Sequence, residues 1–240
     1  MSREIYTTMT AASASQRHLE HIANNLANVN TTGYKERRIS FESVLAKQNP
    51  GPLAEGYTKL SDGQINQEAG SLLQDNVRTH FAIRGNGFFV VENGSGERFL
   101  TRSGNFEIDS QGFLVNQRGE KVQTNTGPLQ FDDFQREDFS ISRDGRFIDG
   151  RGGEFARLLL MDGDNLEPLP GNRWKGENFQ AIDIDSVDIE QGFLESSNVN
   201  PFRTMIEMME TTRHLEMYQK AMQSSKEMDG FLNMMARRSQ

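Results

Sequence analysis

The strongest constraint on the fold is the placement of two helix-like segments at the ends of the chain, around a middle rich in strand and turn signals. In the first thirty residues, apolar side chains recur at spacings near three and four, which predicts one face of an amphipathic α-helix. These positions are Ile5, Met9, Ala12, Leu19, Ile22, Leu26 and Val29. Gly33 is suited to the left-handed turn that follows a helix, so we expect the helix to stop there.

A second helical pattern begins near residue 198 and continues toward the C-terminus. Asn198 or Asn200 is suited to cap this helix, and Pro201 favours its first turn. The spacing is close to a heptad repeat with two polar members. The repeat runs through Met205, Met208, Thr212, Leu215, Gln219 and Met222, and then shifts to Met228, Leu232 and Met235. Because methionine is unbranched and adaptable, this seam predicts either a helix core or a deformable interface with neighbours that are not identical.

The middle of the chain predicts antiparallel β structure. Between residues 80 and 190, short apolar runs such as Phe88–Val91 alternate with turns rich in Gly, Asn and Asp. Gly112 and Gly145 stand in hairpin turns that need positive φ. Residues 157–161 and 182–189 are further strand candidates. Residues 34–80 predict a long connection with short strands, interrupted by the breaker at 48–52.

Charge is distributed unevenly along the 240 residues. The net charge is −8, but the two ends are close to neutral and residues 51–200 carry −11. An acidic middle argues against nucleic acid as a partner, because phosphates require a basic surface. No stretch approaches the roughly 18 apolar residues of a membrane span. Charged residues in the first twenty positions also interrupt any apolar core of a cleavable secretory signal, so we expect no such signal.

No cofactor or metal is predicted. Cysteine is absent, which excludes thiolate metal sites and cysteine nucleophiles. His18 and His21 lie three residues apart, but no third ligand has a matching spacing, so a solvated face is favoured over a metal site. The acidic series at Asp183, Asp185, Asp188 and Glu190 lacks the order of a calcium loop and predicts a solvated strand face.

Three motifs, in the same order along the chain, resemble the flagellar rod and hook protein family. Residues 24–34, NNLANVNTTGY, resemble the N-terminal signature of that family. Residues 192–200, GFLESSNVN, resemble the segment that leads into its C-terminal helix. Between them, residues 83–90 and 101–106 resemble its β domain. The resemblance therefore spans nearly the whole chain.

The resemblance implies an α+β fold with four parts. Residues 1–33 are expected to form an N-terminal helix that pairs with the C-terminal helix of residues 191–240 in a coiled-coil-like inner domain. Residues 34–80 are expected to form an extended connection, and residues 81–190 an outward-facing antiparallel β-rich domain. The implied function is that of a non-enzymatic structural subunit of the proximal rod of the bacterial flagellar basal body. It would assemble helically with its own copies and related rod proteins around an export channel, after export by the flagellar type III apparatus without cleavage.

Both ends of the chain are expected to supply the assembly interface. Asn24 and Asn28 would lie on one helix face, which predicts either a fraying helix end or a polar ladder that fixes subunit register. The expected interface consists of Ile5, Met9, Leu19, Ile22, Asn24, Asn25, Leu26, Asn28, Val29, Asn30, Gly33, Asn198, Val199, Asn200, Met205, Met208, Met209, Arg213, Leu215 and Met222.

Other functions remain open at this point. Within the same family, the chain resembles a distal rod subunit or a hook-type subunit. Outside it, a wall-acting hydrolase would need a pair of carboxylates, and acidic residues are plentiful. A secreted carbohydrate-binding β module would need an aromatic platform, which a single Trp and four Tyr support poorly.

Overall fold

The computed structural model describes the backbone of residues 3–45, 56–132, 138–182 and 187–238. The chain divides into two compact units. The helical unit comprises Met1–Ala27, Arg37–Gln64 and Asn200–Gln240, and the β unit comprises Asn28–Glu36 and Ile65–Val199. Both classes of structure predicted from the sequence are present, so the α+β class is confirmed.

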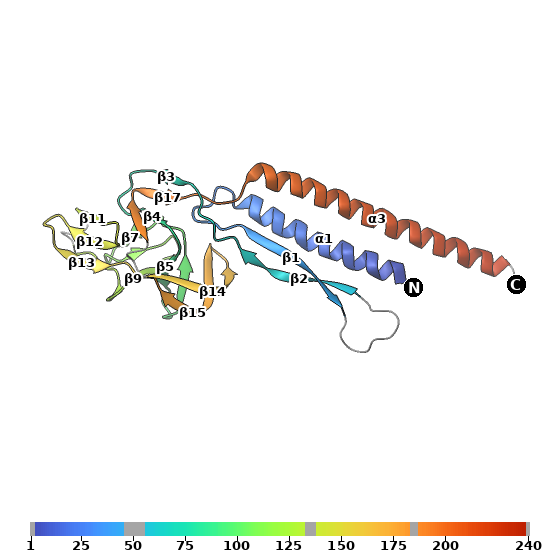
Figure 1. Cartoon of the computed structure of the whole chain (residues 1–240), viewed down its shortest axis with the longest axis horizontal. Helices are drawn as coiled ribbons and strands as arrows, with labels where there is room; N and C mark the ends of the chain where they lie inside the picture. The colour runs from blue at the N-terminus through green and yellow to red at the C-terminus, as the bar shows by residue number, and fades with distance from the viewer. Residues whose placement is uncertain (1–2, 46–55, 133–137, 183–186, 239–240) are drawn as a thin grey trace. The chain divides into compact units, whose positions relative to one another are not determined.

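The helical unit contains α1 (Arg3–Ala27) and α3 (Pro201–Arg238), which lie side by side (Figure 1). It also contains a two-stranded sheet of β1 (Arg37–Leu45) and β2 (Gly56–Ile65). These strands of nine and ten residues are longer than the short strands expected between residues 34 and 80. Within the described residues, neither helix is long and apolar enough to cross a membrane.

The β unit is built around one large antiparallel sheet. Its strands are ordered β14-β15-β6-β5-β9-β8-β7, and β10 also pairs with β9. Because β14 also pairs with β5, the four strands at one end close into a ring. The bounds are β5 (Phe88–Glu92), β6 (Arg98–Thr101), β7 (Glu107–Ile108), β8 (Leu114–Val115), β9 (Lys121–Thr124), β10 (Gly127–Pro128), β14 (Leu160–Leu169) and β15 (Arg173–Ala181).

Smaller antiparallel sheets complete the β unit. One has three strands in the order β11-β12-β13, and two further sheets pair β16 with β4 and β17 with β3. The last two sheets join segments that are far apart in the sequence, because each pairs a strand before residue 85 with one after residue 187. The bounds are β3 (Leu72–Gln74), β4 (Phe81–Arg84), β11 (Phe139–Ile141), β12 (Arg146–Asp149), β13 (Glu154–Arg157), β16 (Asp188–Gln191) and β17 (Phe193–Glu195).

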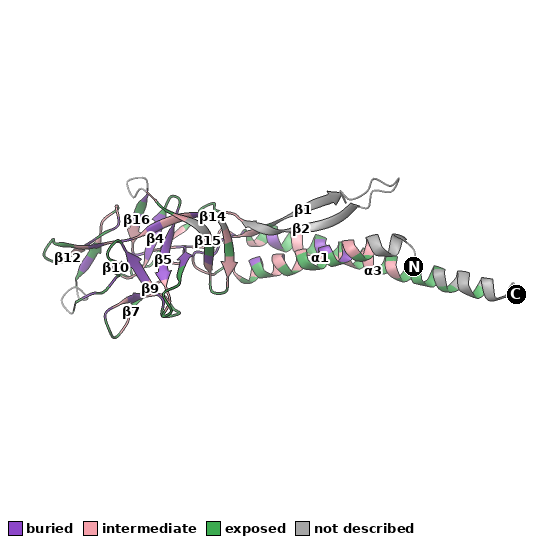
Figure 2. Ribbon diagram, turned by 90° about the horizontal axis from the view of Figure 1, so that it is seen from below, coloured by how far each residue is buried: buried purple, intermediate pink, exposed green. Residues whose placement is uncertain are grey.

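Two hydrophobic clusters lie on opposite faces of β5, whose strand is buried in Figure 2. Phe89 and Val91 belong to the larger cluster, whereas Phe88 and Val90 pack with Leu100 and Trp174 in the smaller one. The uninterrupted apolar run therefore reflects a strand that is covered on both faces. Phenylalanine rings dominate the larger cluster; the rings of Phe81 and Phe147, for example, meet edge to face at 5.7 Å.

The predicted hairpin turns are confirmed. Gly112 joins β7 to β8 with φ of 88°, and Gly145 joins β11 to β12 with φ of 75°. In the first turn the carboxylate of Asp109 accepts hydrogen bonds from the backbone N–H groups of Gln111 and Phe113, each at 2.8 Å. The side chain and the glycine together fix the turn, as expected for Asp–x–x–Gly sequences.

The prediction of one strand over residues 157–161 is wrong. Arg157 ends β13, and Leu160 begins β14. Between them the backbone N–H of Leu158 donates to the carbonyl of Gly145, and that of Leu159 donates to Gln123. The apolar run therefore crosses from one sheet to another rather than pairing along one edge. The other predicted strand covers residues 182–189. Residues 183–186, which include Asp183 and Asp185, lie outside the described residues, and β16 begins at Asp188.

Because the β unit has its own core, we expect residues 28–199 to fold without the two helices. Far-ultraviolet circular dichroism of this fragment should show β structure and a single cooperative thermal transition. Substitution of Phe147, which is fully buried, by Ala should lower the free energy of unfolding by about 3–5 kcal/mol. A fragment that shows no cooperative transition would contradict this expectation.

Candidate assembly surface

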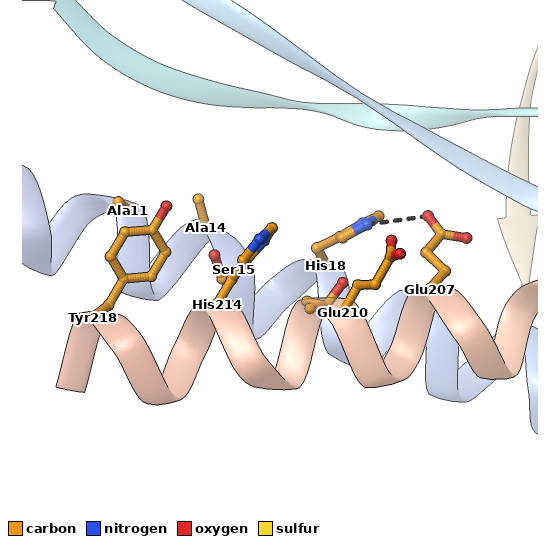
Figure 3. Close-up of a pocket in the computed structure, with 9 residues that line it drawn as sticks. Ala11, Ala14, Ser15, His18, Glu207, Glu210, His214 and Tyr218 are labelled. Atoms are coloured by element: carbon orange, nitrogen blue, oxygen red, sulfur yellow. Dashed lines mark ion pairs between the residues drawn. The ribbon is translucent and has the colours of Figure 1, made fainter. Parts of the chain in front are cut away.

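Small and polar side chains take part in the contact between α1 and α3. Ala12 and Ala14 of α1 and Thr211 of α3 are buried, which is consistent with a close approach of the two backbones. Nε2 of His18 lies 3.2 Å from Oε1 of Glu207, so the histidine faces α3 rather than the solvated surface expected from the sequence (Figure 3).

A polar groove of about 410 Å³ runs along this contact. Figure 3 shows Ala11, Ala14 and Ser15 of α1 opposite larger side chains of α3. The groove is lined by Ala11, Ala14, Ser15, His18, Glu207, Glu210, Thr211, His214 and Tyr218. Among the residues that the structure describes, no three His, Asp or Glu side chains are placed to hold a metal ion.

The opposite side of α3 exposes large apolar side chains, which we call the outer face of α3. At about 100° per residue, these positions fall within an arc of roughly 140°, opposite Thr211 and Tyr218, which line the groove. Phe202 is the most exposed at 78%. The outer face consists of Phe202, Met205, Ile206, Met209, Met217, Met228 and Met234. Large apolar side chains of α3 are therefore exposed although α1 lies beside this helix.

The apolar residues expected at the interface are distributed over both sides of the helices. Ile22 is buried, and Leu19, Leu26, Val29, Met208, Leu215 and Met222 are half-buried. Exposed residues are Met9, Met205, Met209 and Arg213. Ile5 lies in α1, but its side chain is outside the described residues. The sequence pattern identified the apolar positions of α3, but did not show that they belong to two faces.

The asparagines of the N-terminal signature have separate structural roles. Asn25 is buried and exchanges two hydrogen bonds with the backbone of Arg37, at 2.9 and 3.1 Å, which ties the end of α1 to β1. The helix ends at Ala27, six residues before the expected stop at Gly33, because the carbonyl and side chain of Asn28 accept bonds from Thr31 in a turn. Exposed Asn24 thus lies in the helix and Asn28 beyond it, and their role in subunit register stays a prediction.

The asparagines before α3 also act within the chain. The side chain of Asn198 donates to the carbonyls of Asn66 and Glu68, both at 2.9 Å, and accepts from the N–H of Glu36 at 2.7 Å. Asn200 is exposed and accepts a bond from the N–H of Arg203 at 3.1 Å. The predicted capping of α3 by Asn200 is therefore confirmed.

Sequence reasoning missed a buried cluster of three charged residues in the β unit. Glu195 accepts from Nζ of Lys35 at 2.7 Å and from Nε of Arg102 at 2.5 Å, and each of these side chains is at most 2% exposed. The N–H of Gly70 donates to the same carboxylate at 2.9 Å. Arg102 also donates to the carbonyls of Ile83, Gly85 and Gly87, and Lys35 to that of Glu68.

Gly33 sits directly against this cluster. It has φ of 66°, which confirms the predicted left-handed turn, and its N–H donates to the carbonyl of Glu195 at 2.7 Å. A Cβ atom at this position would lie 2.5 Å from the carbonyl carbon of Arg102. In the sequence, exposed Asn30 lies three residues before Gly33, and buried Val199 lies four residues after Glu195. The glycine is therefore required by close backbone approach as well as by its turn.

The cluster shifts the pKa values of two of its members. Burial raises the pKa of the Glu195 carboxyl, but the charges of Arg102 and Lys35 and their hydrogen bonds outweigh burial and hold it below its ordinary value of 4.5. Burial lowers the pKa of Lys35, and the charge of Glu195 only partly offsets this effect. Each of the three buried groups is therefore favoured in its ionised form only while its charged partners are present.

Substituting Glu195 by Gln should destabilise the β unit strongly. The change keeps the side-chain shape but leaves two buried cations without their counter-ion, so we expect a loss of about 3–5 kcal/mol in urea unfolding. Glu190→Gln provides the control, because its partner Arg84 is 64% exposed. That variant should lose less than about 1 kcal/mol. Equal losses in the two variants would show that the cluster contributes little.

The stabilisation by Glu195 should depend on pH. Because its pKa is lowered in the folded chain, its contribution is fully present above the ordinary value of 4.5 and is lost as pH falls through the lowered value. The difference in unfolding free energy between the wild-type chain and Glu195→Gln should therefore be constant from pH 7 to about 5 and shrink toward pH 2. A difference that stays constant across this range would contradict the assignment.

Family models match three segments of the chain. The flagella basal body rod protein model matches residues 5–35, and the D1 domain model of the flagellar hook protein FlgE/F/G matches residues 82–148. The C-terminal model of the flagellar basal body rod FlgEFG protein matches residues 190–235. The matched segments include most of α1, most of α3 and much of the β unit.

Similar proteins match over nearly their whole length. Flagellar basal-body rod protein FlgG of Borreliella burgdorferi is 30% identical, over 99% of this chain and 100% of the relative. FlgG of Bacillus subtilis is 29% identical over 95% and 96%, and flagellar basal-body rod protein FlgF of Rhizobium meliloti is 28% identical over 89% of each. From its sequence and fold, this chain belongs to the family of flagellar basal-body rod proteins and is a structural rod subunit.

Proposed function

We propose that this chain joins the proximal part of the bacterial flagellar rod by packing its helical unit against copies of itself and related rod proteins. The single observation that carries the proposal is the outer face of α3, which presents seven exposed apolar side chains on one side of a helix. Monomeric proteins rarely expose an apolar patch of this kind unless it binds a partner.

Burial of the outer face supplies the driving force for assembly. Fully covering a side chain the size of Met, Ile or Phe is worth about 1.5–3 kcal/mol relative to leaving it in water. Several such side chains covered by one neighbour exceed the cost of ordering them. The expected interface at both ends of the chain is retained in the proposal, with the outer face of α3 as its centre.

We further propose that α1 and α3 pair in a coiled-coil-like manner. Met208, Leu215 and Met222 are seven residues apart and half-buried, which is the spacing of a heptad seam. The helical units would stack helically around an export channel and transmit torque, and the acidic β unit would face outward. In this proposal the chain leaves the cytoplasm through the flagellar export apparatus, without loss of a signal peptide, and joins the rod that spans the periplasm.

We propose a proximal position in the rod because this chain lacks segments that a related rod protein carries. The alignment with FlgG of Borreliella burgdorferi extends over 277 positions, more than the 240 residues of this chain, so that relative carries segments absent here. By family resemblance, a distal rod subunit has a longer insertion in the region of residues 45–75. A distal or hook-type position in the same structure is the alternative.

No observation favours an enzyme. The buried carboxylates among the described residues are Glu120 and Glu195. Glu120 is paired with Arg173, and Glu195 with Lys35 and Arg102. A wall-acting hydrolase needs two carboxyl groups that converge on a substrate, and these two are committed to ion pairs instead. We therefore propose a non-enzymatic function without a cofactor.

Charged substitutions on the outer face should block incorporation into the rod. Ile206→Glu combined with Met209→Glu places two carboxylates where a neighbour would bury apolar side chains. We expect the monomer to keep its helicity, while the amount of subunit in isolated basal bodies falls at least roughly tenfold, because buried unpaired charge is strongly unfavourable. Immunoblots of basal bodies and swimming in soft agar measure the effect in cells that lack the wild-type copy.

Gln219→Glu is the control, because it adds one negative charge to α3 at an exposed position outside the outer face. It should incorporate and swim like the wild-type chain. If the double variant also incorporated normally, the outer face would not be the assembly surface.

A further inference from the structure

Sulfur in this chain is concentrated at exposed positions of the helices. The sequence has eleven methionines and no cysteine. Met9 of α1 and five methionines of the outer face are between 47% and 63% exposed: Met205, Met209, Met217, Met228 and Met234. Met161, Met208 and Met222 are only half-buried, and no methionine is among the buried core residues that the structure describes. Core filling therefore does not explain these side chains.

Exposed methionine reacts with peroxides. The thioether sulfur attacks the peroxide, one oxygen atom is transferred to form a sulfoxide, and the peroxide is reduced to water while the sulfur loses two electrons. The reaction turns a flexible apolar side chain into a polar one with a strong hydrogen-bond acceptor. With no cysteine in the chain and the single Trp buried, the exposed methionines are the most accessible oxidation targets.

We infer that the outer face of α3 is a methionine-oxidation site through which peroxide reversibly blocks assembly of the free subunit. The inference rests on the proposed function, because a sulfoxide matters there only if a neighbour buries that face. Each sulfoxide adds a polar oxygen that must give up its water when a neighbour covers the outer face, which is unfavourable. Arg213, Lys220, Gln223 and Ser224 are exposed hydrogen-bond donors within the same arc. Once the subunit is assembled, the same sulfur atoms are covered and protected.

The first test uses the purified full-length monomer and hydrogen peroxide. Peptide mass spectrometry over time should show oxidation of the six exposed methionines before Met161, Met208 and Met222. Methionine sulfoxide reductases should reverse the modification. Similar rates at exposed and half-buried positions, measured while circular dichroism shows that the chain is still folded, would overturn the inference without any measurement of assembly.

The second test measures incorporation of treated subunit. Wild-type chain treated with peroxide should incorporate at least roughly tenfold less than untreated chain, because two or more sulfoxides would be buried. A variant with Leu at the six exposed methionines should incorporate with or without peroxide. A control variant with Leu at the three half-buried methionines should remain as sensitive as the wild-type chain.

The outcomes separate this inference from the proposed function. If untreated wild-type chain did not incorporate, the proposed function would fail, and with it the effect of oxidation on assembly. If untreated and oxidised chains incorporated equally, the proposed function would stand and the oxidation inference would be overturned. Equal sensitivity of the six-Leu variant and the wild-type chain would also overturn it, since the damage would then lie elsewhere.

Discussion

The buried carboxylate of Glu195 is the interaction on which the β unit most depends. It joins Lys35, which follows α1 in the sequence, to Arg102 in the middle of the chain and to β17 just before α3. Lys35 and Glu195 are 160 residues apart, so their ion pair closes a long loop of chain. The two segments that lead into the helices are thereby fixed to one body.

Stability alone does not account for the burial of three charged side chains in one cluster. The free energy needed to remove three charges from water offsets much of the free energy gained from their attraction. Proteins with apolar replacements of similar volume are often as stable. The geometry here is demanding: Arg102 also donates to three backbone carbonyls, and the carboxylate also accepts from the backbone of Gly70. These bonds join the segments around residues 35, 70, 85, 102 and 195 at one buried point, so the cluster fixes how those segments meet.

Local features of the fold could be predicted from the sequence, and non-local ones could not. The turns at Gly33, Gly112 and Gly145 and the cap at Asn200 depend on a few neighbouring residues, whose conformational preferences are strong. The Lys35–Glu195 pair and the closure of β14 onto β5 depend on residues far apart in the sequence, and no periodic pattern marks them. The same limit applies to α3, where spacing identified apolar residues but not the two faces they occupy.

The two units use different apolar residues, and the difference follows from what each must do. The larger core of the β unit is built from phenylalanines such as Phe89 and Phe106, whose rings meet edge to face at 5.3 Å and hold one arrangement. The outer face of α3 is built mainly from methionine, which adapts its shape to different surfaces. A subunit that must contact several related but unequal neighbours needs a rigid body and an adaptable contact surface. In the proposed assembly, methionine provides that adaptability, and it also leaves the same surface open to oxidation before a neighbour covers it.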